Sequence, residues 1–64
     1  LQDKKGEAWA HHNLGRVYMN LSNYEEASKH YEEALFLAEE LGEEELTVCS
    51  KDALSEIKGM EKSI

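Results

Sequence analysis

Apolar residues return at steps of three and four along most of the chain, which is the spacing of residues on one side of an α-helix. In residues 24–41 the apolar side consists of Tyr24, Ala27, Tyr31, Ala34, Leu35, Ala38 and Leu41. After residue 42 a similar stripe consists of Leu46, Cys49, Ser50, Ala53, Ile57, Met60 and Ile64. The sequence therefore predicts an all-α fold with helices at about residues 4–21, 24–41 and 43–62.

Residues that favour helix ends lie at the predicted boundaries. Asp3 can cap the first helix, and either Ser22 or Asn23 can accept a hydrogen bond from an exposed N–H of the second. Gly42 suits the left-handed conformation that ends many helices. Because residues 20–23 form so short a turn, the first two helices are expected to be antiparallel.

The first predicted helix has two different sides. At 100° per residue, one side carries Ala10, His11, Leu14, Gly15, Val17, Tyr18 and Leu21. We predict that this side faces the core. Gly15 has no side chain, so a second helix can approach closely there.

Residues 8–41 resemble one unit of the tetratricopeptide repeat (TPR) family. The resemblance lies in Leu14, Gly15, Tyr18, Tyr24, Ala27, Tyr31 and Ala34, which stand at the spacings of that family's packing signature. It implies a helix-turn-helix unit used for protein binding, in which Ala27 meets Gly15 across the hairpin. The third helix then makes the fold a three-helix α-solenoid fragment.

The other side of the first helix is unusual for a solvated surface, which would normally carry Lys and Glu. It consists of Trp9, His12, Asn13, Arg16, Met19 and Asn20. The family resemblance implies that this side lines a concave groove for a partner, so these six residues form the predicted partner-binding groove. In the alternative interpretation, Trp9, Asn13 and Val17 pack against an upstream repeat.

The chain also resembles itself at a shift of 40 residues, a longer period than the commoner 34. The shift pairs Leu14 with Leu54 and Val17 with Ile57, and residues 1–7 resemble the junction that follows a repeat. We therefore expect a single unit, residues 1–64, that is a fragment of a longer array with upstream repeats stacked on it.

The third helix departs from the repeat pattern. When the chain is aligned with itself at this shift, the core positions of the first helix correspond to polar residues of the third. The first-helix residues His11, Gly15, Tyr18 and Leu21 align with Lys51, Ser55, Lys58 and Glu61. Polar residues at these places indicate that no partner helix follows. The third helix is therefore predicted to be an antiparallel cap on the second, with Leu46, Ala53 and Ile57 buried and Lys51, Ser55, Lys58 and Lys62 in water.

Charge narrows the class of partner. The net charge of −7 disfavours nucleic acid and anionic membranes, which attract clustered Lys and Arg. The second helix carries three acidic pairs and Phe36 on its outer side, which we interpret as a solvated face. A single cysteine, Cys49, and the lack of a long apolar run predict a cytoplasmic protein.

No arrangement of residues indicates catalysis, a cofactor or a metal. His11 and His12 are adjacent rather than four apart, so they lack the spacing of a helical zinc site. We predict that the chain is not an enzyme. The leading hypothesis is a scaffold or adaptor module that binds a peptide or helix of a partner protein, and the alternative is a structural cap without a site of its own.

Overall fold

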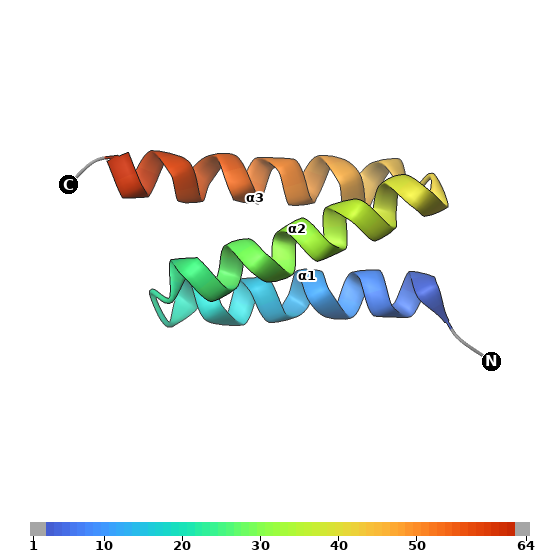
Figure 1. The fold of residues 1–64 in the computed structure, drawn as a ribbon, viewed down its shortest axis with the longest axis horizontal. Helices are drawn as coiled ribbons and strands as arrows, with labels where there is room; N and C mark the ends of the chain where they lie inside the picture. The colour runs from blue at the N-terminus through green and yellow to red at the C-terminus, as the bar shows by residue number, and fades with distance from the viewer. Residues whose placement is uncertain (1–2, 63–64) are drawn as a thin grey trace.

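The computed structural model describes residues 3–62 and contains three α-helices joined by short turns. They are α1 (Lys4–Asn20), α2 (Tyr24–Leu41) and α3 (Glu44–Lys62). Figure 1 shows them side by side, with each helix running opposite to the one before it. α2 packs against both α1 and α3, so the predicted all-α hairpin with a third antiparallel helix is confirmed.

The helix ends follow the predicted capping residues. Asp3 caps α1, because its side chain accepts a hydrogen bond from the Gly6 N–H at 3.0 Å. Of the two candidates for α2, it is Asn23 that accepts, from the Glu26 N–H at 3.5 Å. Gly42 has φ 71° and ψ 26°, the left-handed conformation expected of it.

The core consists of two small clusters along α2. The first contains Ala8, Ala38 and Leu46, one residue from each helix, with Trp9 and Leu37 packed against it. The second contains Ala27, Tyr31 and Ile57, with Tyr18, Met19, Tyr24, Ala53 and Leu54 packed against it. Small residues dominate the side of α2 toward its neighbours, which lets both helices approach it closely.

Gly15 is the point of closest approach between α1 and α2. A Cβ atom at this position would lie 2.9 Å from Cε1 of Tyr31. The space that the missing side chain leaves is therefore filled by the Tyr31 ring. The resemblance assigned that contact to Ala27, but the nearest atoms belong to Tyr31, one helical turn further along α2.

The predicted core side of α1 is wrong in part. His11, Gly15 and Tyr18 do face α2, but Ala10, Leu14, Val17 and Leu21 are exposed. The buried residues of α1 are Ala8, His12 and Gly15. The apolar side of the first helix is thus wider than the surface that α2 covers. The uncovered half is called the exposed apolar stripe and consists of Ala10, Leu14, Val17 and Leu21.

The predicted apolar side of α2 is confirmed except at its end. Leu41, the last residue of the helix, is 39% exposed, whereas the rest of the apolar side is buried or half-buried. Leu41 lies beyond the surface that α1 and α3 cover.

The predicted faces of α3 are confirmed with one exception. Leu46, Ser50 and Ile57 are buried, Cys49 and Ala53 are half-buried, and Met60 near the end is exposed. The predicted solvent side, Lys51, Ser55 and Lys58, is exposed, as a capping helix requires. Ile64 and the side chain of Lys62 lie outside the described part of the chain.

Candidate functional site

The predicted groove residues of α1 divide into an exposed group and a packed group. Asn13, Arg16 and Asn20 are exposed, and together with Val17 they line a shallow hollow of about 240 Å³. They stand three and four residues apart, so one turn of helix places each beside the next. The hollow offers amide groups and a guanidinium to a partner.

His12, by contrast, lies inside the hairpin. Its ring is in edge contact with Trp9, at a centroid distance of 5.7 Å, and with Tyr31, at 5.3 Å. It is 9% exposed, and its Nδ1 atom has no hydrogen-bond partner. The structure therefore gives His12 a packing role beneath the exposed residues.

Burial changes the acid–base behaviour of this histidine. Desolvation lowers the pKa of His12 below its ordinary value of 6.5, and the positive charge of Arg16 lowers it further. Both causes disfavour the imidazolium form. His12 is therefore favoured as a neutral, largely apolar part of the hairpin.

Tyr31 connects α2 with charges on both neighbouring helices. Burial raises its pKa above the ordinary 10.0; Arg16 of α1 opposes the rise, and Glu56 of α3 adds to it. The charges of Arg16 and Glu56 therefore act on the Tyr31 pKa in opposite directions.

Trp9 and Met19 are half-buried at the edges of the same side. Trp9 packs against the cluster of Ala8, Ala38 and Leu46, and Met19 packs against the second cluster. The packing of Trp9 and Met19 explains in part why this side of α1 lacks the Lys and Glu residues of an ordinary solvated surface. Each still exposes some surface beside the polar residues of the hollow.

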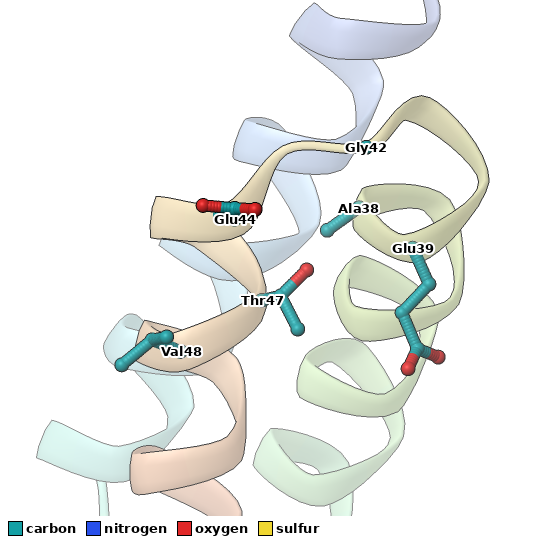
Figure 2. Close-up of a pocket in the computed structure, with 6 residues that line it drawn as sticks. All are labelled: Ala38, Glu39, Gly42, Glu44, Thr47 and Val48. Carbon is teal, nitrogen blue, oxygen red and sulfur yellow. The ribbon is translucent and has the colours of Figure 1, made fainter.

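A second hollow, of about 480 Å³, lies between the end of α2 and the start of α3. Ala38, Glu39, Gly42, Glu44, Thr47 and Val48 line it. In Figure 2, Ala38 and Thr47 lie between the two helices, and Glu39 and Val48 lie at opposite sides. The sequence did not indicate this hollow, because it depends on the angle at which α3 leaves the turn at Gly42.

The described residues, 3–62, contain no group of three or more His, Cys, Asp or Glu side chains that could hold a metal ion. None of the helices in this part of the chain is long and apolar enough to cross a membrane.

The family model described as tetratricopeptide repeat matches residues 8–41. The chain belongs to the tetratricopeptide repeat family. The match begins in α1 and ends with α2, so the hairpin is the TPR unit and α3 follows it. TPR units are typically non-catalytic modules for protein–protein interaction, which is the general class of function that the family supports.

Comparison with curated proteins gave no match, and comparison with solved structures gave none either.

Proposed function

We propose that this TPR unit binds an extended or helical segment of a partner protein through Asn13, Arg16 and Asn20 of α1. The observation that carries the proposal is the grouping of these three exposed side chains around one hollow. Trp9 and Met19 add apolar surface at its edges. The chain acts as an adaptor or scaffold module.

The chemistry of this surface favours a partner segment with acidic and aromatic side chains. Arg16 can form a bidentate hydrogen bond with a carboxylate, and the Asn amides can both donate to and accept from a peptide backbone. Aromatic and Arg side chains are frequent sources of binding energy at protein interfaces. The whole chain has a net charge of −7, which disfavours nucleic acid and anionic membranes as partners.

Selection from a library of displayed peptides on the immobilised chain tests the proposal without a known partner. For a selected peptide, Arg16→Ala should weaken binding by more than about fivefold, or roughly 1 kcal/mol. The matched control is Lys29→Ala, which removes a cation from the exposed outer side of α2 and should leave affinity unchanged. Equal affinity of both variants and the unaltered chain would exclude this surface as the site.

The second candidate function is structural, and the exposed apolar stripe of α1 favours it. Leu14, Val17 and Leu21 are 43%, 51% and 68% exposed. At the 40-residue shift, Leu14 and Val17 correspond to Leu54 and Ile57, the residues with which α3 packs onto the second core cluster around α2. The stripe is therefore suited to pack on an α2-like helix of an upstream repeat, with α3 closing the other end.

A tandem fusion tests this packing. A second copy of residues 1–40 is placed before residue 1, so that α1 of the original unit can dock on α2 of the added copy. The fusion should unfold at a higher temperature than the single chain, because stacked repeats stabilise each other. Val17→Lys in the original unit should remove the gain, and an equal gain with this variant would contradict the stacking.

We also place the module in the cytoplasm. Cys49 is a free, half-buried thiol, and a lone cysteine suits a reducing compartment.

A further inference from the structure

Two histidines from different helices meet on the flank of the hairpin. The Nδ1 atoms of His11 in α1 and His30 in α2 form a hydrogen bond of 3.3 Å, in which the tautomers decide which ring donates and which accepts. Their ring centroids are 5.5 Å apart, with 28° between the ring planes. Since the centroids are so much farther apart than the Nδ1 atoms, the rings meet through the edges that carry Nδ1.

His30 also contacts an aromatic ring of α1. The Tyr18 ring lies nearly parallel to the His30 ring, with 5.4 Å between centroids and 5° between planes. Both histidines are half-buried, so water reaches part of each ring. The hydrogen bond needs a hydrogen on one of the two Nδ1 atoms. When that hydrogen moves to Nε2 of the same ring, the bond is lost and both Nδ1 atoms have a free lone pair.

We propose that His11 and His30 form a two-histidine binding site for a divalent transition-metal ion such as Zn²⁺, Ni²⁺ or Cu²⁺. Two nitrogen ligands at the usual zinc distance and a tetrahedral angle stand about 3.3 Å apart, which matches the separation of the Nδ1 atoms. Imidazole nitrogen suits these three ions. The metal lies beside the line that joins the nitrogens, and a small rotation of each ring about its flexible terminal torsion directs both lone pairs at it.

The site is open. Within residues 3–62 no third His, Cys, Asp or Glu side chain completes a metal-binding group with the pair, so water fills the other coordination positions. The two ligands belong to different helices and are 19 residues apart in the sequence. Metal binding therefore favours the folded hairpin over the unfolded chain and stabilises it.

The site is separate from the proposed partner surface. His11 and Arg16 are five residues apart, which places them about 140° apart around α1. Loss of metal binding and loss of peptide binding can therefore be measured independently.

Thermal unfolding of the full chain with ZnCl₂, NiCl₂ or MgCl₂ tests the proposal. At a zinc concentration about one hundred times its dissociation constant, the Tm should rise by roughly 10 °C or more. Magnesium, which prefers oxygen ligands, should have no such effect. His11→Gln and His30→Gln should each abolish the rise, and Cys49→Ser should keep it.

A measurement on the unaltered chain avoids any folding defect of the variants. In NMR spectra that report the ring nitrogens, zinc should shift the Nδ1 signals of His11 and His30 and leave those of His12 in place. A zinc-dependent rise in Tm that survives in both Gln variants would overturn the proposal. So would ring signals of His11 and His30 that do not change as zinc is added.

Discussion

At the scale of single residues, the contact between Gly15 and Tyr31 sets the distance between α1 and α2. The Leu14-Gly15 pair is part of the repeat signature, so the sequence indicated a close approach at Gly15. It did not show that the whole Tyr31 ring would fill the space, because the ring position depends on how far α2 is shifted along α1. The same shift brings His12 under the ring.

Gly15→Ala tests this contact. The new Cβ would lie about 3 Å from three atoms of the Tyr31 ring, and overpacking of this kind costs about 1–3 kcal/mol. Alanine also favours the helix by about 1 kcal/mol, so we expect a net loss of about 1 kcal/mol in unfolding free energy.

Gly59→Ala is the matched control for that substitution. Gly59 is also in a helix, but no atom outside its own turn of helix lies within 4 Å of the position that a Cβ would take, so only the helix preference acts. This variant should gain about 0.5–1 kcal/mol. Equal effects of the two substitutions in urea unfolding would show that Tyr31 does not press on Gly15.

His12 predicts a dependence of stability on pH. Its pKa in the folded chain is lowered below 6.5, so the unfolded chain binds more protons than the folded one near that pH. The contribution of neutral His12 is fully present above the unfolded pKa and is lost as pH falls from about 6.5 toward the folded pKa. The stability of the chain should therefore fall on acidification through this range.

The Tm measured at several pH values in His12→Leu and His11→Gln checks this origin. His12→Leu should flatten the fall in Tm below about pH 6.5, since the variant has no group to protonate at that site. His11→Gln should keep the contribution of His12. If the Tm of His12→Leu fell with pH as steeply as that of the unaltered chain, the pH dependence would come from other groups.

At the scale of the helices, the pattern of apolar residues predicted the number, order and approximate ends of all three. Asp3 and Asn23 cap the starts of α1 and α2, and Gly42 caps the end of α2, because the local chemistry of these residues suffices to begin or end a helix. The pattern predicted the core side of α1 wrongly in part, because it could not show how much of the wide apolar side of this helix α2 would cover. Covered and uncovered apolar residues look alike in the sequence.

The capping role of α3 leads to a direct mutational test. Ile57 is 1% exposed and packs with Ala27 and Tyr31. Ile57→Ala should cost about 2–5 kcal/mol, a large part of the stability of so small a chain.

Its neighbour Lys58 is exposed, and Lys58→Ala should change the unfolding free energy by less than about 0.5 kcal/mol. Denaturant unfolding measures both. A tolerant Ile57, together with unchanged stability when the chain is cut after Gly42, would mean that α3 docks outside this chain.

At the scale of the whole molecule, the three helices form an elongated unit about 43 Å long, in which α2 packs against both α1 and α3. This arrangement leaves α1 with a polar surface around Arg16 and an apolar stripe around Val17. Of the residues in the predicted groove, the exposure of Asn13, Arg16 and Asn20 could be predicted from the sequence, because polar residues at helical spacing lie on one side of the helix. The buried position of His12 could not, because it depends on packing between helices.

Chemical-shift mapping with a library-selected peptide tests the central proposal most directly. The backbone amide signals of Asn13, Arg16 and Asn20 should move most as the peptide is added. Signals of Glu32 and Phe36, on the outer side of α2, should stay in place. Shifts centred on Phe36 with none at Arg16 would contradict the account.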